Sequence, residues 1–223
     1  SNYLGCLNML ELAKSSVADM LYISSGDVYG ETELDLINEN NYGYINILNE
    51  RSSYSSSKRA SETLCYSYYK QYGLNTYIIR PAHIYGPTFT ASDSRAISDF
   101  IRCVINDKDI IMKSDGSSVR SYCYVGDTIV GLFDVLLKGE PGDAYNISNT
   151  EAFTSIKNTA EILANLCNKK VIIDLPKDEL AKKIDSNVKI IKLNNNKLKQ
   201  LGWTPLYSIQ KGLETTVKIL KNK

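Results

Sequence analysis

The stretch Met20-Leu-Tyr-Ile-Ser-Ser-Gly-Asp-Val-Tyr-Gly-Glu31 sets the class of fold that this chain can adopt. A short, mostly apolar run is followed at once by small polar residues and glycine, as at the carboxyl end of a buried parallel strand. Ligands bind beyond such strand ends in open α/β sheets. Ser25 and Asp27 are therefore candidates for a binding or catalytic site. The alternative for Ser24 and Ser25 is an ordinary strand-to-loop turn.

Strand and helix patterns alternate on both sides of this stretch. They predict helices over 7–14 and 55–72 and a strand over 76–80. This alternation predicts the second half of a Rossmann-like doubly wound parallel sheet, which is an α/β fold. The other predicted helices cover 96–106, 127–138, 155–167 and 209–220, and the other predicted strands cover 21–24, 110–113, 118–122, 145–147 and 171–173.

The pattern becomes mixed beyond Gly86-Pro87, which predicts a second and smaller body. We expect residues 1–90 and 124–150 to form a partial Rossmann-like domain that carries the catalytic groups. Residues 91–123 and 151–223 are expected to form a mixed α/β substrate-binding cap. The stretch 182–196 is predicted to be the softest part of the chain.

The helix predicted after the first strand carries Tyr54 and, one turn later, Lys58. A free phenol has a pKa of about 10, so a phenolate base near pH 7 needs about 4 kcal/mol of stabilisation. One ammonium at about 5 Å and an effective dielectric of about 20 supplies about 3 kcal/mol. The difference leaves room for a second cation such as an oxidised nicotinamide ring, so the pair indicates a dinucleotide cofactor. In a chain with 16 tyrosines, the same spacing also fits a solvated helix face.

Further segments follow in an order that matches one family. They are the segments at 2–13, 24–30, 54–58, 79–87, 120–127, 144–148 and 201–205. On these segments the whole chain resembles the NAD-dependent epimerase/dehydratase family of nucleotide-sugar enzymes, within the extended short-chain dehydrogenase/reductase superfamily. The resemblance implies that Tyr54 takes a sugar hydroxyl proton and that Ser25 hydrogen-bonds the same oxygen. It implies that Lys58 binds the nicotinamide ribose and favours the phenolate.

The resemblance also suggests cofactor and substrate contacts outside this trio. Ser24, Pro81 and His83 join Tyr54 and Lys58 as expected cofactor-binding residues. Arg120 is the first candidate for gripping the substrate diphosphate and Arg95 the second, because Arg binds such groups bidentately. His83 either donates a hydrogen bond to the diphosphate or fills the pocket wall. The expected cofactor is NAD rather than NADP, and the expected substrate is a UDP- or dTDP-sugar.

Members of this family form a shared 4-keto sugar intermediate and then catalyse different reactions. The resemblance implies that residues 26 and 27 help to determine which reaction follows. Gly26 cannot donate a proton, which argues against 4,6-dehydration. Asp27 holds the substrate, acts as a weak acid or base, or caps the local backbone. The resemblance favours an epimerase or a UDP-glucuronate-decarboxylase-like enzyme. The alternatives are a dTDP-glucose 4,6-dehydratase, a 4-ketosugar reductase and a catalytically silent nucleotide-sugar-binding protein.

The family's glycine-rich turn, which receives the cofactor pyrophosphate at a helix N-terminus, has no counterpart in these 223 residues. The chain opens in what resembles the helix before the fourth strand. We therefore expect a carboxyl-terminal fragment without the first half of the nucleotide fold, and no turnover by these residues alone. A homodimer through a four-helix bundle is expected for the full-length protein.

Composition fits a cytoplasmic globular protein: 43% of the residues are hydrophobic, 23% are charged, and the net charge is +1. No apolar run is long enough to cross a membrane, and the late lysines lack the aromatic residues of a nucleic-acid site. The five cysteines lie far apart and His83 is the only histidine, so we expect no metal site.

Overall fold

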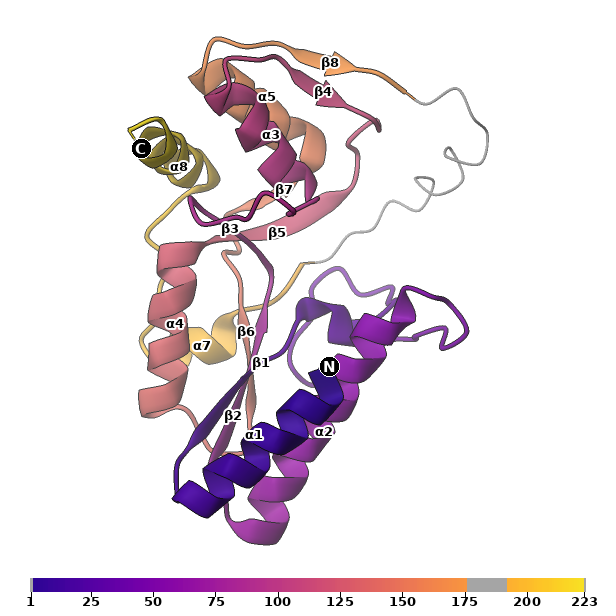
Figure 1. Cartoon of the computed structure of the whole chain (residues 1–223), viewed down its shortest axis with the longest axis vertical. Helices are drawn as coiled ribbons and strands as arrows, with labels where there is room; N and C mark the ends of the chain where they lie inside the picture. Colours follow the sequence, from indigo (N-terminus) through magenta and orange to yellow (C-terminus); the bar gives the residue numbers. More distant parts are fainter. Residues whose placement is uncertain (1, 176–191, 223) are drawn as a thin grey trace. The chain divides into compact units, whose positions relative to one another are not determined.

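The computed structural model describes residues 2–175 and 192–222, and these fold into two compact units. Unit 1 comprises residues 1–82, 128–148 and 193–204, and unit 2 comprises residues 83–127, 149–192 and 205–223. Helix α4 (Val125–Lys138) begins in unit 2 and continues into unit 1. Figure 1 shows the elements along the chain.

A parallel sheet forms the centre of unit 1. Its strands are β1 (Met20–Ile23), β2 (Thr76–Pro81) and β6 (Ala144–Ile147), in the order β1-β2-β6. Ile79 of β2 lies opposite Ile23 on one side and Tyr145 on the other. Strand β2 is buried along almost its whole length, as a parallel strand covered on both faces should be.

Helices cover both faces of this sheet (Figure 1). On one face α1 (Asn2–Ser16) packs against α2 (Ser52–Tyr72), and on the other lie α4 and α7 (Asn196–Gln200). The core under α1 and α2 includes Leu10, Cys65 and Tyr68. Helix α2 ends at Gly73, whose φ of 65° lies in the left-handed region that glycine adopts without strain.

Unit 2 contains two small sheets. In one, β5 (Val119–Tyr124) pairs parallel with β3 (His83–Tyr85) and antiparallel with β7 (Phe153–Ser155). In the other, β4 (Ile110–Met112) pairs parallel with β8 (Val171–Ile173). The helices of this unit are α3 (Ala96–Ile105), α5 (Ile156–Leu166) and α8 (Ile209–Lys221).

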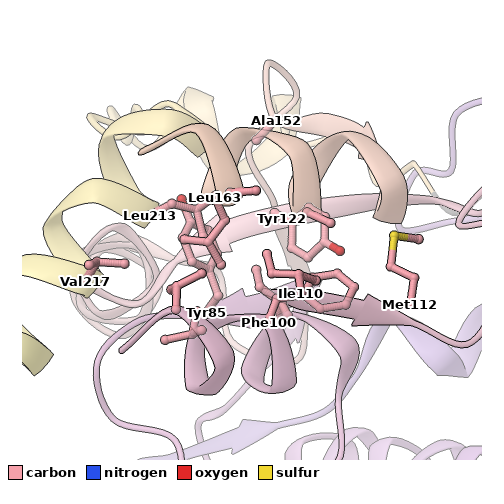
Figure 2. Close-up of a cluster of buried hydrophobic side chains, with 14 of the residues drawn as sticks. Tyr85, Phe100, Ile110, Met112, Tyr122, Ala152, Leu163, Leu213 and Val217 are labelled. Atoms are coloured by element: carbon pink, nitrogen blue, oxygen red, sulfur yellow. The ribbon is translucent and has the colours of Figure 1, made fainter. Parts of the chain in front are cut away.

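The core of unit 2 gathers aromatic and aliphatic side chains from these sheets and helices (Figure 2). Phe100 of α3, Leu163 of α5 and Leu213 of α8 meet at its centre with Tyr85 of β3. A Cβ added at Gly212 would lie 2.0 Å from the Tyr85 hydroxyl oxygen, so only glycine lets α8 approach β3 this closely.

The structure confirms the predicted α/β class. Most predicted elements lie within three residues of the observed ones, but the helix predicted over 7–14 is longer and covers Asn2–Ser16. The structure adds the 3₁₀ helix η1 (Gly26–Tyr29), β3, β7 and α7, none of which has a clear periodic pattern. Of the stretch predicted to be soft, residues 182–191 lie outside the described residues. For its end the prediction is wrong, because Leu193 and Asn195 are 0% exposed and Asn195 bonds the Ser148 carbonyl. The division into a Rossmann-like domain and a cap stays a prediction.

Candidate active site

The first strand of unit 1 ends in the segment that carries the candidate hydroxyls. Ser24 donates its backbone N–H to the Ile79 carbonyl at 2.8 Å, which extends the sheet by one residue. Its side chain is buried, and among the described residues the hydroxyl oxygen has no hydrogen-bond partner. Ser25 follows in an extended conformation and begins η1, where its hydroxyl accepts the Asp27 N–H at 3.1 Å. The sequence therefore ends the strand with a serine cap that exposes the Asp27 side chain.

Helix α2 brings Tyr54 and Lys58 to this strand end. The Lys58 ammonium donates to the Ile23 carbonyl at 2.7 Å, and it lies 5.8 Å from the centre of the Tyr54 ring. It also lies 4.9 Å from the ring of Tyr22. Partial burial lowers the pKa of Lys58. The Tyr54 side chain is 43% exposed, so a ligand beyond the strand end can reach its hydroxyl.

Asp27 lies in the first turn of η1 with an exposed side chain. The cap of that turn comes from the Ser25 hydroxyl, and the Asp27 carboxylate makes no hydrogen bond to the described residues. The local-capping alternative for Asp27 is therefore not supported, whereas its roles in substrate binding or proton transfer remain open.

A buried polar network, which the sequence patterns do not predict, connects the strands and helix of this segment. Arg80 of β2 makes a two-pronged ion pair with Glu62 of α2, with the shortest N–O distance at 2.7 Å. Arg80 also donates to the Tyr29 hydroxyl at 2.9 Å, and that hydroxyl donates to Asn146 at 2.6 Å. An arginine in the otherwise apolar strand 76–81 was the available signal, because a buried charge needs a partner.

A cavity of about 480 Å³ lies beside this network rather than at Tyr54 and Lys58. Tyr29, Tyr42, Arg59 and Tyr66 are among its lining residues. Its charged groups already have protein partners. Arg59, for example, donates to the Val28 carbonyl at 2.6 Å and the Gly43 carbonyl at 2.8 Å.

The predicted substrate-binding residues lie in unit 2, around the buried side chain of Tyr122. The His83 ring meets the Tyr122 ring edge-on, with 6.0 Å between the ring centres. Arg120, two residues before Tyr122 on β5, donates to the Val119 carbonyl at 3.0 Å. Burial raises the pKa of Tyr122, and the positive charges of Arg120 and Arg95 oppose that rise.

Arg95 is held more firmly than the sequence indicates. Its guanidinium forms an ion pair with Asp93 at 2.6 Å and donates to the Ile84 carbonyl at 2.7 Å. Much of its hydrogen-bonding capacity is thus already used. In unit 1, Pro81 ends β2, the strand next to Ser24. The candidate residues therefore fall into two groups, one in each unit.

A parallel sheet covered by helices on both faces, with candidate ligand-binding residues beyond the carboxyl end of one strand, is the arrangement of a Rossmann-like α/β protein. The chain belongs to the NAD dependent epimerase/dehydratase family, whose sequence model matches residues 1–148. The family predicted from the sequence is therefore confirmed.

Curated relatives extend the similarity over nearly the whole chain. UDP-glucuronic acid decarboxylase 5 of Arabidopsis thaliana is 33% identical over 218 residues, which cover 96% of this chain and 61% of that protein. UDP-glucuronic acid decarboxylase 1 of Danio rerio is 30% identical over 218 residues, covering 98% of this chain and 51% of the relative. The chain thus spans between half and two thirds of the length of these relatives.

Solved structures share the fold. UDP-glucose 4-epimerase from Thermotoga maritima superposes with a TM-score of 0.84 at 22% identity, covering 99% of this chain and 69% of that one. A dTDP-glucose 4,6-dehydratase from Bacillus anthracis gives 0.82 at 24% identity, covering 100% and 68%. At this level of identity the likeness concerns the fold.

No helix in the described ranges is both long and apolar enough to span a membrane. Within the same ranges, His, Cys, Asp and Glu side chains nowhere gather in a group that could hold a metal ion.

Proposed function

We propose that this chain carries the catalytic and sugar-nucleotide-binding part of an NAD-dependent enzyme that converts UDP-sugars through a 4-keto intermediate. UDP-glucuronate decarboxylation is the favoured activity. The observation that carries the proposal is the Lys58 ammonium on the Ile23 carbonyl, beside the strand end with Ser25 and one helical turn from Tyr54. The match to curated UDP-glucuronic acid decarboxylases over 96% of the chain supports the substrate class.

In this proposal the residues of unit 1 handle the proton of the sugar 4-hydroxyl. Tyr54 takes the proton, and Ser25 hydrogen-bonds the same oxygen and holds it in line. Lys58 favours the phenolate form, since its ammonium lies within the range of useful Coulomb attraction. Asp27, exposed and without a described partner, holds the substrate or transfers a second proton.

The residues at the strand end fit the nicotinamide ribose of NAD. The buried Ser24 hydroxyl lacks a partner among the described residues, and Lys58 keeps donor capacity beyond its single bond to Ile23. NAD would supply the hydride acceptor. Pro81 and His83 are proposed as its further contacts. The pyrophosphate end of NAD has no matching glycine-rich turn within these 223 residues.

Removal of hydride from C4 of UDP-glucuronate places a ketone in the β position to the sugar carboxylate. A β-keto carboxylate loses CO2 readily and leaves an enolate, which then takes up a proton at C5. In this route no hydroxyl group departs. Gly26, which cannot donate a proton, is compatible with this route, whereas 4,6-dehydration requires a proton for the departing hydroxyl. A UDP-uronate epimerase remains the second candidate, because it would use the same Tyr54, Ser25 and Lys58.

We propose that unit 2 binds the nucleotide diphosphate, with Arg120 as the main cation and His83 and Arg95 beside it. Arg120 lies at the edge of the buried Tyr122, where water is partly excluded and a charge-assisted bond is stronger. We further propose that the protein works as a cytoplasmic homodimer.

The proposal is tested by calorimetric titration of the purified chain with UDP-glucuronate, UDP-glucose and NAD, each alone. We expect both UDP-sugars to bind, with UDP-glucuronate the tighter, and NAD to bind too weakly to measure. Arg120→Ala should weaken UDP-sugar binding by about tenfold or more, the cost of one charge-assisted bond. Leu137→Ala, on α4 and 75% exposed, is the matched control and should leave binding unchanged.

Failure of both UDP-sugars to bind a folded chain would reject the proposed substrate class. Turnover of UDP-glucuronate with NAD would overturn the expectation that these residues need a further segment. The product would then identify the branch, since CO2 release marks a decarboxylase and a UDP-uronate isomer marks an epimerase.

A further inference from the structure

The segment that carries Ser25 and Asp27 is weakly held by its own backbone. Within η1, the Val28 N–H bonds the Ser25 carbonyl and the Gly30 N–H bonds the Asp27 carbonyl, both at 3.2 Å. A single turn of 3₁₀ helix has poorer hydrogen-bond geometry than an α-helix and does not persist by itself. Contacts from outside the turn must therefore fix the position of Ser25 and Asp27.

Tyr29 ends this turn, and its side chain is 1% exposed. Its hydroxyl accepts a hydrogen bond from Arg80 of β2 at 2.9 Å and donates one to Asn146 of β6 at 2.6 Å. The guanidinium carbon of Arg80 also lies 5.0 Å from the centre of the Tyr29 ring. One side chain thus ties the turn to two strands of the parallel sheet.

The second anchor of this connection is the helix that carries Tyr54 and Lys58. Glu62, one turn beyond Lys58 on α2, accepts from both Nε and Nη2 of Arg80. The Arg80 and Glu62 side chains are 5% and 11% exposed, so the pair is shielded from water and its geometry is held tightly. One path from the turn to the helix therefore runs through Tyr29, Arg80 and Glu62. A second is direct, because Arg59 of α2 donates to the Val28 carbonyl at 2.6 Å and to the Tyr29 carbonyl at 3.3 Å.

The Tyr29 hydroxyl stays protonated under all ordinary conditions. Burial raises the pKa of Tyr29 to about 12, even though the nearby Arg80 charge acts in the opposite direction. It can therefore donate to Asn146 and accept from Arg80 at the same time.

We propose that Tyr29 is a positioning residue that fixes Ser25 and Asp27 relative to the helix bearing Tyr54 and Lys58. It touches no reacting atom. This inference rests on the proposed function for the roles of those four residues, but the connection itself is a property of the folded chain.

The test is amide hydrogen exchange on the purified chain with Tyr29→Phe, which keeps the ring and removes only the hydroxyl. We expect the amides of Asp27, Val28 and Gly30 to exchange about tenfold faster, because a buried arginine and asparagine each lose a partner. The amides of β2 should change by less than about twofold. Tyr145→Phe is the matched control, since Tyr145 is 2% exposed and its hydroxyl accepts from the Glu140 N–H, away from the turn.

Unchanged exchange in the turn, or an equal rise in the turn and in β2, would overturn the proposal. The second of these would mean that the hydroxyl supports the sheet as a whole. Glu62→Gln, which weakens the anchor on α2 and keeps the Tyr29 hydroxyl, should raise exchange of the same three amides. If Tyr29→Phe does not fold, exchange in Glu62→Gln tests whether the connection to α2 fixes the turn, and unchanged exchange there would overturn the proposal.

A catalytic readout separates this inference from the proposed function. Under conditions that give turnover of UDP-glucuronate with NAD, Tyr29→Phe should lower kcat by about tenfold with KM changed less than about twofold. Tyr145→Phe should change neither. If no variant turns over substrate, as we expect for these residues alone, the exchange result still decides the role of Tyr29, and the binding of UDP-sugars tests the proposed function separately.

Discussion

At the scale of single residues, Asp93 fixes the position of the Arg95 guanidinium. Its carboxylate accepts the Arg95 backbone N–H, two guanidinium nitrogens of Arg95 and the Ser98 hydroxyl at the start of α3. The hydrogen bonds from Arg95 hold the pKa of Asp93 well below its usual range. A carboxyl with a lowered folded-state pKa stabilises the fold above the unfolded-state pKa of about 4, and this contribution is lost as the pH falls through the folded-state pKa.

We therefore predict that Asp93→Asn lowers the free energy of unfolding by about 1 kcal/mol at pH 7 and by clearly less at pH 3. For a chain of this size the loss at pH 7 corresponds to about 2–4 °C in Tm. Thermal unfolding of both proteins at the two pH values measures it. Asp99→Asn is the control, because the exposed Asp99 carboxylate pairs with Arg102 and with no other cation in the part of the chain that the structure describes. An equal loss at both pH values would contradict the ionic origin.

At this scale the sequence indicates residues whose signal is local. The spacing of Tyr54 and Lys58 predicts one shared helical face, and in the structure the Lys58 ammonium lies 5.8 Å from the Tyr54 ring centre and bonds the Ile23 carbonyl at the end of β1. The catalytic roles of the two residues stay a prediction. The sequence could not predict the hydrogen bonds of Tyr29 to Arg80 and Asn146, because these three residues are far apart in the chain and meet only in the folded sheet.

At the scale of elements, the contact between α1 and α2 fixes how firmly the helix of Tyr54 is held. Cys6 of α1 and Cys65 of α2 lie in this contact with 3.7 Å between their sulfurs, and both are buried. The hydrogen bond with Cys6 and burial raise the pKa of the Cys65 thiol. A thiol reagent can therefore reach Cys65 only when the two helices separate.

We predict that Cys65 reacts with iodoacetamide on the order of 100-fold more slowly than the half-buried Cys103 on α3. Mass spectrometry of peptides from a labelling time course measures both rates. In a denaturing concentration of urea the two rates should become similar, which controls for intrinsic reactivity. Equal rates without denaturant would mean that α1 and α2 part readily.

Helices and strands could be predicted from the sequence where they are long. Helix α2 has 21 residues and strand β2 is buried along almost its whole length, and the predictions lie within three residues of their ends. Strands β3 and β7 have three residues each, so alternation cannot be recognised, and their pairing with β5 determines them. The cap at Ser25 is the only local signal for η1.

At the scale of the whole molecule, exposed apolar side chains on α1 support the proposed homodimer. Leu4 is 64% exposed, Met9 53% and Leu12 55%, and an apolar group of this kind on one helix is typical of an interface. Helix α4 offers a competing surface, with Phe133 54% and Leu137 75% exposed. The two surfaces lead to different outcomes for the same experiment.

We predict that the purified chain sediments as a dimer and that Leu12→Asp converts it to a monomer, because a buried unpaired carboxylate opposes association. Leu137→Asp is the matched control and should leave the dimer intact. Sedimentation velocity over a hundredfold range of concentration measures the three proteins, with circular dichroism to check that each is folded. A monomeric parent chain would contradict the homodimer for these residues, whereas dissociation by Leu137→Asp alone would transfer the interface to α4.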